Sequence, residues 1–145
     1  MPSSKKIKKH IPISIERVDG DGYHIFCKIT VEGKKLRAII DTGASKTVFS
    51  EKIIDTLSKV TIVQQNENIA AGIGSEAVSA KIAMIPRIYF GKKQVRLLMV
   101  GVMDISHIAD QYAELGLKPF DVIIGGDILK AKQCSINYAE KVLLM

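Results

Sequence analysis

A single carboxylate follows directly on an apolar run that has the character of a buried strand. Residues 38–40 read Ala-Ile-Ile, and Asp41 comes next, ahead of Thr42, Gly43 and Ala44. An ionised Asp at the dry end of a strand is costly unless it has a partner or its burial serves chemistry. The hydroxyl of Thr42 can lock a turn, Gly43 lets backbone approach a ligand, and Ala44 keeps the floor of a groove small. The stretch therefore predicts one carboxylate at the bottom of a groove, and an Asx-turn at a strand end is the structural alternative.

Cysteine and histidine chemistry is disfavoured by position. His24 and Cys27 are three residues apart on an expected strand, so their side chains would point to opposite faces and could not form a nucleophilic pair. His10, His24 and His107 fall in different expected elements without the spacing of zinc ligands. We therefore expect no metal and no cofactor.

Two glycine-containing motifs favour turns over ligand loops. Asp-Gly-Asp-Gly at residues 19–22 lacks the later ligands and the terminal Glu of a calcium loop. Gly-Ile-Gly at residues 72–74 lacks the frame of a phosphate-binding loop and is typical of a hairpin tip.

The elements that must position Asp41 are mainly strands. Alternating apolar residues predict strands, and apolar residues spaced three and four apart predict helices. Helix caps are expected at Ser50 and at Asp127, and Gly116 is expected to end a helix. The expected strands cover 11–15, 23–31, a run ending at Asp41, 60–63, 78–85, 95–100, the run before Gly125 and the C-terminal segment; the expected helices follow Ser50, span 105–112 and follow Gly125.

Length and composition indicate an ordinary globular domain. The chain has 145 residues, of which 47% are hydrophobic and 25% charged. We expect a flexible basic tail over residues 1–10 and one domain over residues 11–145. No run of about 18 apolar residues could span a bilayer and no apolar signal core follows the N-terminus, so we expect a cytoplasmic protein without membrane contact. Cys27 and Cys134 are too few for a disulfide scaffold and are expected as free thiols.

The positive charge does not predict nucleic-acid binding. The formal net charge is +6, and Lys5, Lys6, Lys8 and Lys9 contribute much of it from the terminal tail. The other basic residues are scattered and no nucleic-acid-binding module is recognisable. A solvated tail is favoured.

Three stretches taken together resemble the retropepsin family of aspartic proteases. They are "AIIDTGAS", the glycine-tipped "AAGIGSEAVSAKIAMIP" and "DVIIGGDIL", in that order, and the resemblance extends from about residue 11 to the end. It implies a mainly β fold, the retropepsin-like acid-protease β-barrel with two or three short helices. The stretch "SEKIIDTL" is more similar to cellular and bacterial members than to viral ones.

The resemblance also implies roles for particular residues. Asp41 would be catalytic, and Thr42 would bond across to a second subunit. The residues 72–74 would form a flap over a peptide or protein substrate. Carried over position by position, the roles fall on Asp41 (catalytic), on Thr42, Gly43, Ala44 and Ser45 (active-site loop), on Gly72, Ile73 and Gly74 (flap), and on Ile123, Ile124 and Gly125 (the strand that supports the loop).

Only one Asp-Thr-Gly occurs in the chain, so the second carboxylate of such a site must come from another copy. A homodimer with a two-fold axis would bring each Asp41 against its mate. Such a pair would hold one proton, deprotonate a water and protonate the scissile carbonyl.

The pattern departs from viral members at two positions. These commonly carry an acid just after Asp-Thr-Gly-Ala and an Arg after the later Gly, and the two pair; this chain has Ser45 and Gly126 there. No charge is left without a partner, but the loop must be held in another way. The helix around residues 105–116 looks like an insertion relative to compact viral enzymes.

Three classes of function stay open at this point. A dimeric aspartic endopeptidase is favoured, because a protein that only binds peptides has no need of an expensive carboxylate pair. A catalytically inactive dimer that uses the groove as a peptide-binding or scaffold surface is the alternative. A basic nucleic-acid-binding or scaffold protein is the third.

Overall fold

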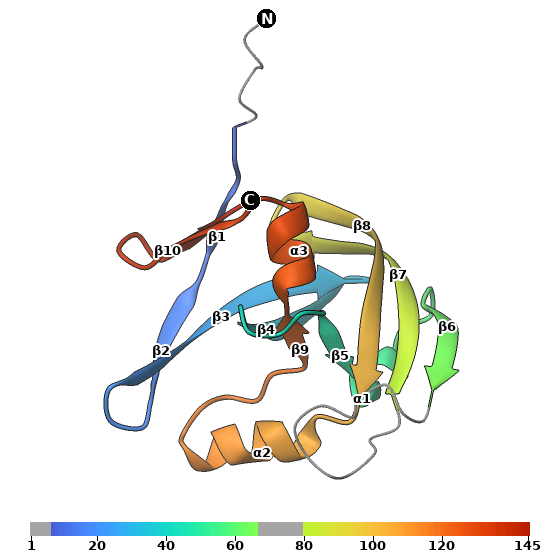
Figure 1. Cartoon of the computed structure of the whole chain (residues 1–145), viewed down its shortest axis with the longest axis horizontal. Coiled ribbons are helices and arrows are strands. Elements are labelled where there is room, and N and C mark those ends of the chain that lie inside the picture. Colours follow the sequence, from blue (N-terminus) through green and yellow to red (C-terminus); the bar gives the residue numbers. More distant parts are fainter. Residues whose placement is uncertain (1–6, 67–79) are drawn as a thin grey trace, which may run out of the picture.

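The computed structural model describes residues 7–66 and 80–145, and strands dominate it. The main sheet has the strand order β2-β3-β4-β9-β5-β8-β7-β6, and a further pairing of β3 with β7 closes β3, β4, β9, β5, β8 and β7 into a barrel (Figure 1). The predicted mainly β barrel with short helices is confirmed. The strands are β1 (His10–Pro12), β2 (Ser14–Val18), β3 (Gly22–Val31), β4 (Lys34–Ile40), β5 (Val48–Ser50), β6 (Thr61–Asn66), β7 (Ala80–Phe90), β8 (Lys93–Met103), β9 (Val122–Ile124), β10 (Ser135–Asn137) and β11 (Val142–Leu144), and the helices are α1 (Glu51–Ile54), α2 (Ser106–Glu114) and α3 (Gly126–Ala131).

The hairpin of β3 and β4 directs every second side chain into the barrel core. Cys27 pairs with Ala38 and Ile29 with Leu36, and all four side chains are buried in the barrel core. The turn between the strands uses Gly33 at a φ of +77°, a conformation that glycine adopts without steric cost. The expected strand that ends at Asp41 is therefore present, and it is anchored on one side by β3.

The strand β9 anchors the other side of β4. It runs parallel to β4, with Ile124 opposite Ile40, and antiparallel to β5, with Ile123 opposite Val48. Val122 and Ile124 face the barrel core, and Ile123 packs against a second apolar cluster outside it. Both faces of β9 are thus covered, which explains its uninterrupted apolar run. The short β5 has no alternating pattern and was not predicted.

The helices agree with the sequence except at one cap. Ser50 caps α1, because the Ile53 N–H donates to its hydroxyl at 3.2 Å. The prediction that Asp127 caps α3 is wrong: the N-cap is Gly125, and Asp127 lies in the first turn of the helix. A contact with Thr47, described below, occupies its carboxylate instead.

The long hairpin of β7 and β8 extends beyond its predicted end. We expected the first strand to stop at Ile85, before Pro86, but β7 continues to Phe90. Proline is tolerated where a strand has an unpaired edge, and the opposing pairs Ile85–Leu98 and Arg87–Arg96 leave Pro86 outside the register.

The two ends of the chain form a small sheet of their own, in the order β1-β11-β10. Pairing begins at Lys9, whose N–H donates to the Met145 carbonyl at 2.8 Å, and His10 lies in β1 opposite Leu144. Lys9 and His10, expected to be part of the tail over residues 1–10, are therefore bonded to this small sheet. The C-terminal segment expected as one strand is the hairpin of β10 and β11.

A second, smaller core lies outside the barrel. Phe26 and Ile39 point outward from β3 and β4 and pack against Ile105, Leu117 and Phe120, which flank α2. The helix α2 thus covers the outer face of the strand that carries Asp41, and Figure 1 shows it below the barrel.

Candidate functional site

Asp41 lies at the carboxyl end of β4, where the chain leaves the barrel. Its backbone N–H donates to the Ile124 carbonyl at 2.9 Å, so the last contact of β4 is with β9. The Ala44 N–H donates back to the Asp41 carbonyl at 3.1 Å and closes a tight turn. Ile123 and Ile124 lie directly beside the strand that ends at Asp41.

The carboxylate itself is exposed in the single chain, as are Thr42, Gly43 and Ser45, and Ala44 is half-buried. The expectation of a buried carboxylate is therefore wrong for one copy of the chain, because burial of β4 ends at Ile40. The Gly43 N–H donates to Asp41 Oδ1 at 2.9 Å, which is an Asx-turn. This bond holds the Oδ1 end of the carboxylate against the turn.

Asp127 holds the far end of the loop. The Thr47 N–H donates to Asp127 Oδ2 at 3.0 Å, and the Thr47 hydroxyl donates to Oδ1 at 2.8 Å. Thr47 Oγ1 in turn accepts from the Gly125 N–H at 3.1 Å. Thr47 is completely buried, where hydrogen bonds to an ionised acceptor are strong. These bonds join the loop of Ser45 to the segment of Gly126, which must be held together without an acid at the first position and an Arg at the second.

Gly125 is required by close packing. A Cβ at this position would lie 2.7 Å from the Lys46 carbonyl carbon and 2.8 Å from the Ala44 oxygen, both backbone atoms that cannot move aside alone. The next residue, Gly126, donates its N–H to the Ala44 carbonyl at 2.7 Å. The loop that carries Asp41 and the loop before α3 therefore pack backbone against backbone.

A cavity of about 440 Å³ opens beside the carboxylate. Aromatic rings form one wall of the cavity. The ring centroids of His24 and Tyr112 are 5.2 Å apart in an edge-to-face arrangement, and those of Tyr112 and Phe120 are 5.4 Å apart. Asp41 is the one carboxylate among the described residues that line the cavity. The lining residues are Tyr23, His24, Ile25, Ile39, Ile40, Asp41, Thr42, Tyr112, Ile136 and Tyr138.

Several of these residues were not singled out from the sequence. Tyr112 was assigned only to the apolar face of a helix, and nothing in its spacing shows that this helix lies next to Asp41. Thr47 and Asp127 are 80 residues apart. Only the position of Thr47 shortly after Asp-Thr-Gly, and of Asp127 shortly after Ile-Ile-Gly, could have suggested a contact.

Three predicted site residues lie outside the described part of the chain. Gly72, Ile73 and Gly74, expected as a flap, fall between residues 66 and 80, so their role stays a prediction.

Within ranges 7–66 and 80–145, no three His, Cys, Asp or Glu side chains are grouped so that they could hold a metal ion. No helix in the same ranges combines the length and apolar character that crossing a membrane requires.

Comparison with known sequences gives one family and a set of distant relatives. The sequence model of the family described as aspartyl protease matches residues 27–128. Protein DDI1 homolog 2 from Mus musculus is 23% identical over 145 residues, which is 97% of this chain and 33% of that protein. The counterpart from Danio rerio is 24% identical over 143 residues, 96% of this chain and 31% of that protein. The chain thus spans about a third of the length of these relatives.

Solved structures share the fold. A retropepsin-like aspartic protease from Rickettsia conorii superimposes with a TM-score of 0.58 at 15% identity, covering 99% of this chain and 95% of the other. The retroviral protease-like domain of Ddi1 from Leishmania major gives a TM-score of 0.56 at 18% identity, covering 81% and 84%. At such low identity these likenesses support the fold, which is that of retropepsin-like proteases of cellular and bacterial type.

Proposed function

This chain belongs to the aspartyl protease family, and we propose on that premise that it is an aspartic endopeptidase whose site combines Asp41 from each of two copies. The observation that carries the proposal is the exposed Asp41 carboxylate. One of its oxygens is held by the Gly43 N–H, and its loop is fastened to β9 and α3. A fixed carboxylate that faces an open cavity suits general acid–base chemistry.

The second carboxylate has to come from a second copy. No other described residue that lines the cavity beside Asp41 carries a carboxyl group. A two-fold axis close to Asp41 would supply the missing acid from the same residue of the partner and would bury both. The burial expected from the sequence would then be a property of the dimer.

The surface around Thr42 is suited to such an interface. Thr42 lines the Asp41 cavity and also a neighbouring hollow formed with Gly126, Leu129 and Cys134. Next to it, β10 pairs only with β11, so one edge of this strand is open among the described strands. Tyr138, just after β10, is 57% exposed. An open strand edge with apolar neighbours is a common dimerisation surface.

The proposed reaction needs only the two carboxyl groups and water. Two carboxylates a few Å apart cannot both ionise cheaply, so the pair would retain one proton. The ionised member takes a proton from a water molecule, whose oxygen attacks the peptide carbonyl carbon, and the protonated member donates to the carbonyl oxygen. The member that took the water proton then donates it to the amide nitrogen, while the other member takes a proton from a hydroxyl of the tetrahedral diol. The C–N bond breaks, a carboxylic acid and an amine are released, and the pair again holds one proton.

Cleavage of a degenerate peptide library tests this function. The wild-type protein should cut the library, an aspartic-protease transition-state mimic should block cleavage, and Asp41→Asn should abolish it without lowering the melting temperature. Asp55→Asn, which changes an exposed acid outside the site, is the matched control and should keep full activity. Library cleavage by purified Asp41→Asn protein would refute the mechanism.

Binding of peptides without cleavage would favour the alternative of a catalytically inactive dimer that serves as a peptide-binding or scaffold protein. The peptide or protein substrate and a cytoplasmic location stay predictions from the sequence.

A further inference from the structure

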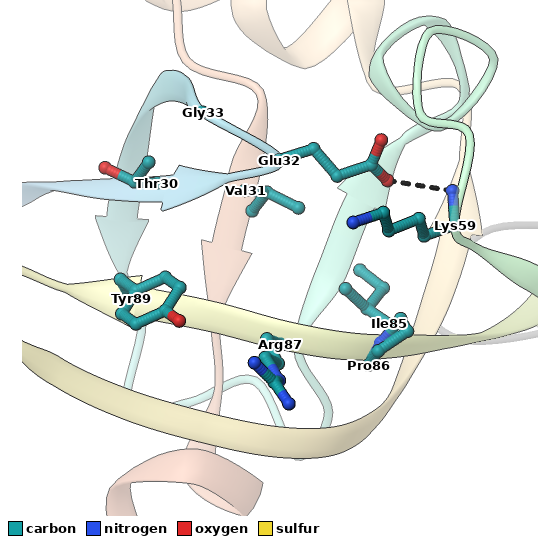
Figure 2. Close-up of a pocket in the computed structure, with 9 residues that line it drawn as sticks. All are labelled: Thr30, Val31, Glu32, Gly33, Lys59, Ile85, Pro86, Arg87 and Tyr89. Atoms are coloured by element: carbon teal, nitrogen blue, oxygen red, sulfur yellow. Dashed lines mark hydrogen bonds between the residues drawn. The ribbon is translucent and has the colours of Figure 1, made fainter.

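A second cavity lies apart from Asp41. It has a volume of about 620 Å³ and shares no lining residue with the cavity beside Asp41. Its walls come from the turn between β3 and β4, from β7 and from the loop before β6 (Figure 2). Val31 and Ile85 are buried beneath it, and its accessible apolar surface comes from Pro86 and Tyr89, which are half-buried. The full lining is Thr30, Val31, Glu32, Gly33, Lys59, Ile85, Pro86, Arg87 and Tyr89.

One wall of this cavity is a stretch of β7 that is paired on one edge only. The pairing of β6 with β7 ends at Met84, opposite Thr61, and β3 meets β7 only at Tyr89, opposite Thr30. Between these points, Ile85, Arg87 and Ile88 of β7 pair only with β8 among the described strands. Pro86 is in no registered pair and has no backbone N–H to offer. A gap of this kind exposes backbone groups to which an extended peptide can add as a strand.

The cavity also carries unbalanced positive charge. Arg87 lies directly opposite Arg96 of β8, so both side chains are on the same face of the sheet, and both are exposed. Like charges in opposing positions repel each other. Lys59 adds a third cation, and Figure 2 shows its side chain reaching toward Val31 and Glu32. The ion pairs found among the described residues, Arg37 with Glu16 and Lys81 with Glu51, involve none of these three cations.

The acid in the lining, Glu32, offsets only one of the two cations that line the cavity, Lys59 and Arg87. Glu32 Oε1 accepts from the Ser58 N–H and hydroxyl, each at 2.9 Å, and Oε2 accepts from the Lys59 N–H at 3.0 Å. These bonds to the backbone, with a smaller contribution from the Lys59 charge, hold the pKa of Glu32 below its usual value. Glu32 therefore serves as an anchor for the loop before β6, with both oxygens engaged.

We propose that this cavity binds an extended acidic segment of a partner protein. An apolar side chain of the segment would rest on Pro86 and Tyr89, its backbone would add to the open edge of β7, and its carboxylates would meet Lys59 and Arg87. Arginine at such a site can hold a carboxylate with two parallel hydrogen bonds. Because the cavity and the Asp41 site share no residue, binding there does not depend on catalysis.

Immobilised eight-residue peptides with one central apolar residue and acidic, amide or basic flanks provide the test. Binding is measured on the full chain carrying Asp41→Asn, so that no peptide is cut. We expect the acidic peptides to bind at least about tenfold more tightly than the amide peptides, in which Gln and Asn replace Glu and Asp. Added salt should weaken the binding of the acidic peptides. Equal binding of acidic and amide peptides would overturn the proposal.

Charge reversal localises the site. Lys59→Glu with Arg87→Glu should reduce the affinity for acidic peptides by about tenfold or more. Lys92→Glu with Lys141→Glu changes the net charge equally at exposed positions away from the cavity and should leave the affinity within about twofold. Equal losses in both double variants would mean nonspecific attraction and would contradict the proposal. If the first double variant fails to fold, Arg87→Gln alone should still weaken the acidic peptides selectively.

Discussion

At the scale of single residues, the geometry around Asp41 depends on two polar partners that are distant in the chain. Asp127 accepts hydrogen bonds from both the N–H and the hydroxyl of Thr47, which is completely buried. Removal of a buried acceptor leaves donors without a partner, and that costs more than the net value of the hydrogen bonds themselves. The Asp41 loop is therefore expected to be sensitive to changes that never touch a substrate.

We expect Asp127→Ala to lower the free energy of unfolding by about 2–3 kcal/mol, because the Thr47 N–H is left buried and unpaired. Turnover in the folded fraction should fall as well, since the loop is fastened less firmly. Asp127→Asn keeps one carbonyl oxygen for Thr47 and should show a smaller loss of both. Denaturant unfolding and steady-state kinetics on the two variants check this, and equal effects of Ala and Asn would argue against the contact.

The two thiols should differ sharply in reactivity. Burial, with a smaller contribution from neighbouring Cys134, raises the pKa of Cys27 to about 12, so almost none of it is thiolate at neutral or mildly alkaline pH. Cys134 is half-buried, and burial raises its pKa too. Mass spectrometry after iodoacetamide treatment of native protein should find Cys134 modified first and Cys27 only after denaturation. Rapid labelling of Cys27 in the folded protein would contradict the buried position.

At the scale of elements, an ion pair fastens β2 to β4 across β3. The Arg37 guanidinium donates to both oxygens of Glu16, at 2.7 and 2.8 Å, and lies over the Phe26 ring at 3.8 Å. This hydrogen bonding to Arg37 holds the pKa of Glu16 below its usual value of 4.5. A lowered pKa in the folded state means that the pair stabilises the protein above that value, and that the stabilisation is lost as pH falls through the lower folded-state pKa.

Glu16→Gln should therefore cost about 1 kcal/mol of unfolding free energy at pH 7, because the bidentate pair is only partly shielded from water. The difference from wild type should shrink as the pH is lowered below 4.5. Chemical denaturation at several pH values measures it, with Glu140→Gln at an exposed turn as the control. A difference that does not change with pH would mean that packing, and not charge, accounts for the loss.

The elements differ in how far the sequence could predict them. Every second residue of β3, from Ile25 to Val31, faces the barrel core, and that periodicity is visible in the chain. The burial of the outward-facing Phe26 depends on the second core, which comes from distant residues. The short β5 is set by its neighbours β8 and β9, and Pro86 continues β7 because its outer edge is open; both depend on tertiary pairing. The same holds for the site: the Asp-Thr-Gly motif was recognisable, but the contacts of Asp41 with β9 and of Thr47 with Asp127 join distant segments.

At the scale of the whole molecule, one chain presents half of the proposed site. Asp41 is exposed and has no second carboxylate beside it in the described part of the chain, while the open edge of β10 lies on the same surface. Association of two copies would supply the second carboxylate and would also cover the open edge of β10. Catalysis should then depend on the dimer and follow its mass action.

Specific activity should therefore fall on dilution, in step with the dimer fraction found by sedimentation at the same concentrations. Asp41→Asn protein should show the same dimer fraction as wild type or a larger one, because a carboxylate facing its mate is replaced by a neutral amide. Constant specific activity over a range in which dimers dissociate would show that one chain is sufficient.

The most direct measurement of the shared site mixes active and inactive chains. A fixed amount of wild-type protein is equilibrated with an equal amount of Asp41→Asn protein, and peptide cleavage is compared with that of wild type alone. If both Asp41 residues are needed, mixed dimers are inactive, and random pairing should reduce the activity to about half. Asp55→Asn in place of Asp41→Asn should not reduce it. Wild-type activity that is unchanged by excess Asp41→Asn chain, under conditions where the chains exchange, would contradict a carboxylate pair shared between two copies.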